Sequence, residues 1–151
     1  MSLFRPHSAV SQLNAAGVWH HPSPELLRIL QISQQIASKS RGAFDVTVQP
    51  LWQLYAQAQK QRRLPDPIEV RQTLQRVGWQ HLQVKPDQIK LMQPGMSVSL
   101  NGIAQGFAAD RVRESLKRDG VRHALIHTGE WSSIGSADGE RPWTLGIADP
   151  H

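Results

Sequence analysis

The chain has 151 residues, with 17 Lys and Arg against 12 Asp and Glu, and a formal net charge of +5. It has no cysteine, which excludes disulfide scaffolds, thiolate zinc sites and cysteine nucleophiles. No apolar run approaches the roughly 18 residues of a membrane-spanning helix, and the first residues lack the apolar core of a secretory signal. The basic residues are scattered, so a mildly basic solvated surface fits them better than a nucleic-acid-binding surface.

The first strong structural signal is a helix that begins at Ser23-Pro24-Glu25. Serine can cap the helix, proline suits its first position, and glutamate is favoured near its positive end. Apolar residues then recur at helical spacing, and the helix should end near residues 40–42. Residues 44–48 alternate between apolar and polar types, which predicts a short strand or extended segment.

Two further helices are predicted in the middle of the chain. One begins at Pro50, and the next begins at Asp66-Pro67, where an acidic cap precedes a proline. The apolar stripe of this third helix is Val70, Leu74 and Val77. Gly78 follows that stripe and is predicted to end the helix in a left-handed conformation.

The rest of the chain is predicted to mix short strands with one long helix. The expected elements are strands at 82–84, 89–91 and 98–100, a helix at 103–118, a strand at 124–127, a turn at 138–139 and a strand at 143–147. This order predicts an α+β fold with a mixed, mostly antiparallel sheet and packed helices.

The first segment that could carry chemistry surrounds Asp45, which lies inside an apolar alternating run. Two interpretations stay open. In one, Asp45 and Thr47 face solvent from a half-buried strand. In the other, the carboxylate hydrogen-bonds a specific group.

The second such segment, residues 99–110, reads as a strand, a glycine turn and a helix. That geometry offers free backbone N–H groups to an anion, but neither common nucleotide-binding fingerprint is present. Purely structural roles also explain it, with Asn101 in a turn and Asp110 paired with Arg111 or Arg113.

The third segment, residues 127–135, is either a ligand-facing loop or an ordinary turn. The seven histidines follow no metal-binding spacing, so a metal site built from histidines is not expected. No serine, histidine and acid are spaced as a nucleophilic triad.

Taken in chain order, these segments resemble the ApbE family, the FAD:protein FMN transferases. The matching segments are 1–8 with 12–14, 42–51 (GAFDVTVQPL), 99–110, 127–135 and 142–150. Three positions depart from the family pattern, because Ser99 replaces Asp, Gln105 replaces Lys and Glu130 replaces Gly. These departures resemble the NosX-like branch, which accompanies maturation of nitrous-oxide reductase.

The resemblance implies the ApbE-type flavin transferase fold and a Mg²⁺-dependent transfer of FMN from FAD to a Thr or Ser of an acceptor protein. It identifies no catalytic residue. By carry-over of the motifs, the residues along the FAD are Phe4, Ala43, Phe44, Asp45 and Gln105, and the carbonyl of Gly102 is a metal ligand.

The resemblance also implies that residues 1–151 are one partial domain, without the N-terminal start and the C-terminal metal-binding half. The complete protein would be periplasmic or associated with the inner membrane. Its partner would be an acceptor flavoprotein, such as a membrane-bound electron-transfer protein of nitrous-oxide reductase maturation, and not nucleic acid. The chain alone is expected to be inactive, and the alternative is a non-catalytic remnant that binds flavin or a partner.

Overall fold

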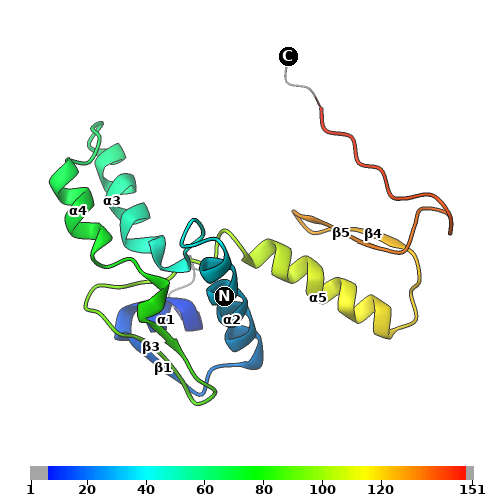
Figure 1. The fold of residues 1–151 in the computed structure, drawn as a ribbon, viewed down its shortest axis with the longest axis horizontal. Helices are drawn as coiled ribbons and strands as arrows, with labels where there is room; N and C mark the ends of the chain where they lie inside the picture. The colour runs from blue at the N-terminus through cyan, green and yellow to red at the C-terminus, as the bar shows by residue number, and fades with distance from the viewer. Residues whose placement is uncertain (1–6, 149–151) are drawn as a thin grey trace. The chain divides into compact units, whose positions relative to one another are not determined.

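The structure, a computed structural model, describes residues 7–148 and divides into two compact units. Unit 1 is Met1–Gly102 and unit 2 is Ile103–His151. Among the described residues, unit 1 has four α-helices and a small sheet, and unit 2 has one α-helix and a β-hairpin (Figure 1). The Phe4 prediction lies outside the described residues.

The helices of unit 1 are α1 (Ala9–Ala16), α2 (Pro24–Lys39), α3 (Gln49–Lys60) and α4 (Pro67–Leu74). The last three begin within one residue of the starts that the sequence predicted. The Ser23 side chain accepts a hydrogen bond from the Leu26 backbone N–H, 3.2 Å away, which confirms the predicted start of α2. Helix α1 was not predicted; its cap is Ser8, and it ends where Gly17 takes a φ of 73°.

The sheet of unit 1 has three antiparallel strands in the order β1-β3-β2. They are β1 (Val18–His20), β2 (Leu82–Val84) and β3 (Gln88–Leu91), so the predicted hairpin is confirmed. Strand β1 has three residues, too few to show a period-2 pattern in the sequence. Helix α2 packs against β2. The buried apolar residues of unit 1 come mainly from α1, α2, the sheet and the segment 96–100.

Two strands predicted in unit 1 are wrong. Residues Val46–Val48 form a single 3₁₀ turn, because the Asp45 carboxylate accepts a hydrogen bond from the Thr47 N–H and bends the backbone. Residues 98–100 are irregular. The Asn14 amide takes the place of a neighbouring strand there, bonding both the N–H (2.7 Å) and the carbonyl (2.9 Å) of Val98.

The predicted left-handed glycine at position 78 is also wrong. Helix α4 ends at Leu74, and Gly78 has an extended backbone with a φ of 161° before the 3₁₀ turn Trp79–His81. Its N–H donates to the Thr47 hydroxyl at 2.8 Å instead of closing a helix. The position therefore serves a contact between distant segments rather than a helix end.

Unit 2 packs α5 (Ala104–Arg118) against a two-stranded antiparallel sheet of β4 (Ala124–His127) and β5 (Trp131–Ile134). The helix and β4 were predicted, and β5 was missed. The predicted strand at 143–147 is wrong, because this segment pairs with no described strand. The turn at 138–139 is confirmed, since the Asp138 carboxylate accepts from the backbone N–H groups of residues 140 and 141.

The fold is α+β with antiparallel sheets, as the order of elements predicted. Among the described residues, no helix is long and apolar enough to cross a membrane.

Candidate functional site

The loop between α2 and α3 holds three predicted cofactor residues. Its backbone reverses through two consecutive positive φ values, 54° at Arg41 and 83° at Gly42. The N–H groups of Ala43 and Phe44 donate to the Ser40 carbonyl and hydroxyl, each at 3.1 Å. These bonds fix the loop backbone to the end of α2. Ala43 is exposed and Phe44 is half-buried.

Asp45 fastens this loop to a segment far along the chain. Its Oδ1 accepts from the N–H (2.8 Å) and hydroxyl (2.7 Å) of Thr47, and its Oδ2 accepts from the Trp79 N–H (2.9 Å). The fully buried Thr47 hydroxyl in turn accepts from the Gly78 N–H. We call these four bonds the Asp45–Thr47 clamp.

The clamp resolves the two interpretations that the sequence left open for Asp45. The carboxylate hydrogen-bonds specific groups and does not face solvent from a strand. A carboxylate oxygen has two lone pairs. Oδ1 accepts two bonds and Oδ2 accepts one, so one acceptor position remains on Oδ2.

Phe44 and Gly102 lie together within unit 1. A Cβ placed on Gly102 would lie 3.4 Å from Cε2 of Phe44, so the phenyl ring rests against the backbone of residue 102. The aromatic ring predicted to contact FAD is therefore next to the residue whose carbonyl was predicted to bind a metal. Nearby, the Ser99 N–H donates to the Val46 carbonyl at 2.7 Å, which joins the two motif segments.

Gln105 lies in the first turn of α5, in unit 2. Its Nε2 would be 3.1 Å from a Cβ on Gly129, so a side chain at position 129 would crowd it. Gly129 has a φ of 93° and lies in the hairpin loop between β4 and β5. The structure thus brings Gln105 to the loop of the third motif segment.

The third segment, residues 127–135, forms a β-hairpin in which a turn joins the end of β4 to β5. His127 and Trp131 are opposite each other across the two strands, and their rings stack with centroids 4.3 Å apart. Neither residue was predicted to belong to a site. The only sequence signal was their spacing across three loop residues, which is typical of a hairpin.

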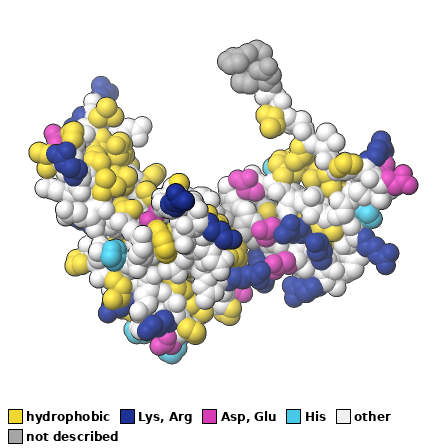
Figure 2. All heavy atoms as spheres, in the orientation of Figure 1, with side chains coloured by type: hydrophobic (Ala, Val, Ile, Leu, Met, Phe, Trp, Pro, Cys, Tyr) yellow, Lys and Arg dark blue, Asp and Glu magenta, His cyan; other side chains and the backbone are white. Residues whose placement is uncertain are grey.

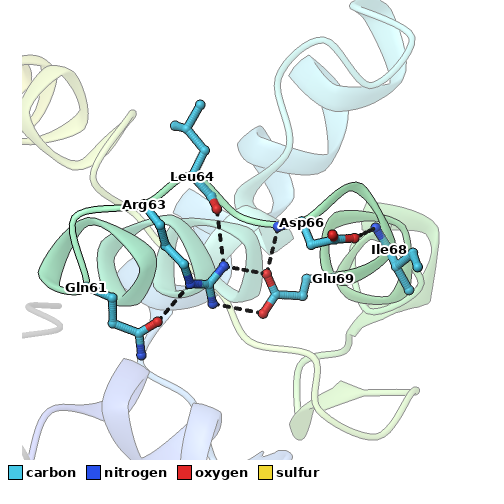
Figure 3. A network of polar contacts seen from close by, with 6 residues as sticks. All are labelled: Gln61, Arg63, Leu64, Asp66, Ile68 and Glu69. Carbon is cyan, nitrogen blue, oxygen red and sulfur yellow. Dashed lines mark hydrogen bonds and ion pairs between the residues drawn. The ribbon is translucent and has the colours of Figure 1, made fainter.

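The clearly shifted pKa values within the described residues belong to exposed side chains. The hydrogen bonds of the Arg63 guanidinium are the main cause that lowers the pKa of Glu69 to about 2. The two groups form a bidentate pair at 2.7 and 3.0 Å (Figure 3). On α5, Asp110 pairs with Arg113 at 3.0 Å, one of the two structural roles that the sequence suggested.

Across residues 7–148 the structure gathers no group of three or more His, Asp or Glu side chains that could hold a metal ion. Mg²⁺ binds oxygen ligands in near-octahedral geometry. The Gly102 carbonyl would supply one ligand, so these residues alone do not fit a complete Mg²⁺ site.

A model of the ApbE family matches residues 1–151. The chain is 30% identical over 156 residues to a FAD:protein FMN transferase of Klebsiella pneumoniae strain 342, covering 99% of this chain and 47% of the relative. It is 28% identical over 173 residues to the FAD:protein FMN transferase of Treponema pallidum, covering 100% of this chain and 47% of the relative.

Solved structures agree with these relatives. The apo form of the flavinyl transferase ApbE of Pseudomonas stutzeri superposes with a TM-score of 0.83 at 29% identity, covering 97% of this chain and 48% of that chain. The ApbE protein of Thermotoga maritima gives a TM-score of 0.83 at 27% identity, with coverage of 99% and 50%. The chain spans about half the length of the curated relatives it matches.

Proposed function

The chain belongs to the ApbE family, and from this we propose that it forms the FAD-binding part of a FAD:protein FMN transferase. The observation that carries the proposal is the hydrogen-bonded loop of residues 42–45, which has the family motif and lies against Gly102. A binding loop whose backbone is already ordered loses little entropy when a ligand arrives.

The proposed reaction is a phosphoryl transfer. The hydroxyl oxygen of a Thr or Ser on the acceptor protein forms a bond to the FMN-side phosphorus of FAD. The bond from that phosphorus to the bridging oxygen breaks, AMP leaves with the electron pair, and the hydroxyl proton is released. Such chemistry depends mainly on positioning and charge stabilisation. When bound, Mg²⁺ would neutralise phosphate charge, and the Gly102 carbonyl would be one of its ligands.

Within the described residues, each proposed FAD contact offers a specific group to the cofactor. Phe44 offers a half-buried ring, and the exposed Ala43 lets the cofactor approach the backbone. Asp45 mainly orders the loop, and its remaining Oδ2 position can accept one hydrogen bond from a ribose hydroxyl or a base N–H. Gln105, on α5, carries an uncharged amide donor where the family has a lysine.

We also place the chain in the NosX-like branch, with a periplasmic acceptor flavoprotein as the partner of the complete protein. The support is the set of departures Ser99, Gln105 and Glu130. A non-catalytic remnant that binds flavin is the second candidate, favoured by the loss of a cation at position 105.

The proposal is tested with a chimera in which residues 1–151 replace the matching part of the Klebsiella relative. Its folding is checked by circular dichroism, and FAD binding is measured by quenching of flavin fluorescence. We expect saturable binding, release of AMP, and covalent FMN on a Thr-containing acceptor peptide. Binding without AMP release would favour the remnant. A folded chimera that binds no FAD would overturn both candidates.

A further inference from the structure

The hairpin of α3 and α4 leaves large apolar side chains in solvent. Trp52 is 57% exposed, Tyr55 is 47% exposed and Leu64 is 82% exposed. Helix α4 contributes no buried residue at all. In Figure 2 hydrophobic side chains gather over this hairpin, at the upper left. A contiguous apolar patch of this kind marks an interaction site more often than isolated exposed residues do.

The patch contains a hollow rather than a flat face. A cavity of about 570 Å³ is lined by Trp52, Tyr55 and Gln59 of α3 and by Arg62, Leu64 and Pro65 of the following loop. The α3 residues are spaced three and four apart, so they lie on one face of the helix. We call this hollow the α3 groove. Its shape suits an inserted side chain better than the flat surface of a lipid bilayer.

The loop that closes the groove is held firmly. Arg63 forms the bidentate pair with Glu69, and it also bonds the Gln61 side chain (2.8 Å) and the Leu64 carbonyl (3.2 Å). Glu69 additionally accepts from the Asp66 N–H at 2.7 Å (Figure 3). Leu64 is therefore presented to solvent by an ordered loop, so a partner has less conformational entropy to overcome.

The charged residues at the groove indicate which charge a partner would need. The Arg63 and Glu69 charges neutralise each other, and the Asp66 carboxylate caps α4. Arg62 also lines the groove, and among residues 7–148 no carboxylate pairs with it. Its φ of 54° is rare for a non-glycine residue. The groove thus combines the apolar side chains of Trp52, Tyr55 and Leu64 with the Arg62 cation, with which no described carboxylate pairs.

We propose that the α3 groove docks an acidic, amphipathic peptide segment of a partner protein. An aromatic or aliphatic side chain of the segment occupies the hollow beside Tyr55 and Leu64, and a neighbouring carboxylate pairs with Arg62. This surface is additional to the proposed flavin site and does not depend on it. A bilayer is disfavoured because polybasic membrane sites use clusters of about four to eight cations.

The test uses the 151-residue chain and a fluorescein-labelled 12-residue peptide with Leu and Phe on one helical face and Glu on the other. A second peptide with Lys in place of Glu is the charge control. We expect saturable anisotropy with the Glu peptide, weaker binding at higher salt, and little binding of the Lys peptide. Leu64→Ser and Arg62→Glu should each weaken binding at least fivefold, and Arg62→Glu should improve binding of the Lys peptide.

Two matched variants make the result specific. Arg41→Glu removes another exposed arginine with a φ of 54°, and Met92→Ser removes another exposed apolar side chain, half of whose surface is in solvent. Both should bind the Glu peptide like the unmodified chain. Equal binding of the two peptides, or equal effects of Arg41→Glu and Arg62→Glu, would overturn the proposal. A dimer of the chain that sedimentation detects and that Leu64→Ser dissociates would also overturn it. So would a chain that binds neither peptide but binds anionic vesicles, with Arg62→Glu abolishing the vesicle binding.

Discussion

Two of the glycine-containing loops that carry family motifs are held in different ways. In unit 1, the loop of residues 42–45 is fastened by Asp45 and Thr47 to backbone N–H groups 34 and 31 residues further along the chain. In unit 2, the loop of residues 128–130 is closed by one local bond, from the Thr128 N–H to the Glu130 carbonyl. The first loop is bonded to a segment far along the chain, and the second is bonded within its own hairpin and lies beside Gln105 of α5.

The two units also differ in the size of their apolar cores, and unit 1 has the larger core among the described residues. In unit 2, the buried apolar residues among those described are Phe107, Ala109, Ile126 and Ile134. In unit 1 they are Val10, Leu13, Leu26, Ile29, Leu30, Ala37, Val46, Ala58, Leu82, Ile89, Leu91, Met96, Val98 and Leu100. Regions with few buried apolar contacts open at lower free energy. We therefore expect the motif loop of unit 1 to be more rigid than the motif loop of unit 2.

The largest effect should come from the core of unit 1. Leu30 is fully buried on α2, so Leu30→Ala should lower the free energy of unfolding by about 2–5 kcal/mol in urea titrations. Ile36→Ala on the same helix is the control, because its side chain is partly in solvent and the loss should be much smaller. Equal losses for the two variants would mean that α2 does not anchor the core.

The clamp should give the next largest effect. Asp45→Ala leaves the Trp79 and Thr47 N–H groups without their acceptors, which should cost about 1–3 kcal/mol of unfolding free energy. The control is Asp87→Ala, at an exposed aspartate of the β2–β3 turn. Amide exchange at Trp79 should accelerate in the first variant only. Unchanged exchange there would contradict the clamp.

The third prediction concerns the N-terminal cap of α2 and how much it stabilises the folded protein. Ser23→Ala removes the acceptor of the Leu26 N–H and should cost about 0.5–2 kcal/mol. Ser38→Ala, at an exposed position within α2, should be neutral or slightly stabilising because alanine is the better helix former. Thermal unfolding of both variants measures the difference. A larger loss of stability in Ser38→Ala than in Ser23→Ala would show that the cap does not stabilise α2.

The smallest effect concerns the surface pair of Arg63 and Glu69. The folded pKa of Glu69 is about 2, below the ordinary value of 4.5, so its contribution to stability is present above pH 4.5. The contribution is lost as the pH falls from 4.5 toward 2. Urea titrations of the chain and of Glu69→Gln across this range should converge at the acidic end. Parallel curves would show that the ion pair adds nothing in solution.

Local chemistry made much of the fold predictable from the sequence. The sequence predicted that helices begin at Ser23 and Asp66, because a capping residue followed directly by proline is a strong start signal contained in a few neighbouring residues. The wrong strand at 44–48 had a period-2 pattern, but the Asp45 side chain bends the backbone there into a 3₁₀ turn. Alternation does not reveal which side chain bonds its own backbone.

The motifs identified the segments of the candidate site but not their connections. No pattern in the sequence links Asp45 to Trp79 or Asn14 to Val98, because each bond joins segments more than 30 residues apart. The contact of Phe44 with Gly102 also joins distant segments, so the sequence did not predict it either. The stack of His127 on Trp131 was missed because β5 has too little apolar alternation to be predicted.

The most direct measurement concerns Thr47, whose hydroxyl completes the clamp without lying among the proposed FAD contacts. FAD affinity is measured for the chimera with Thr47, with Thr47→Val and with Thr47→Ser, together with amide exchange at Gly78. We expect Thr47→Val to speed exchange and weaken FAD binding about tenfold, equivalent to ~1.4 kcal/mol, while Thr47→Ser stays close to the unmodified protein. Faster exchange with unchanged FAD affinity would contradict the claim that the clamp orders a flavin-binding loop.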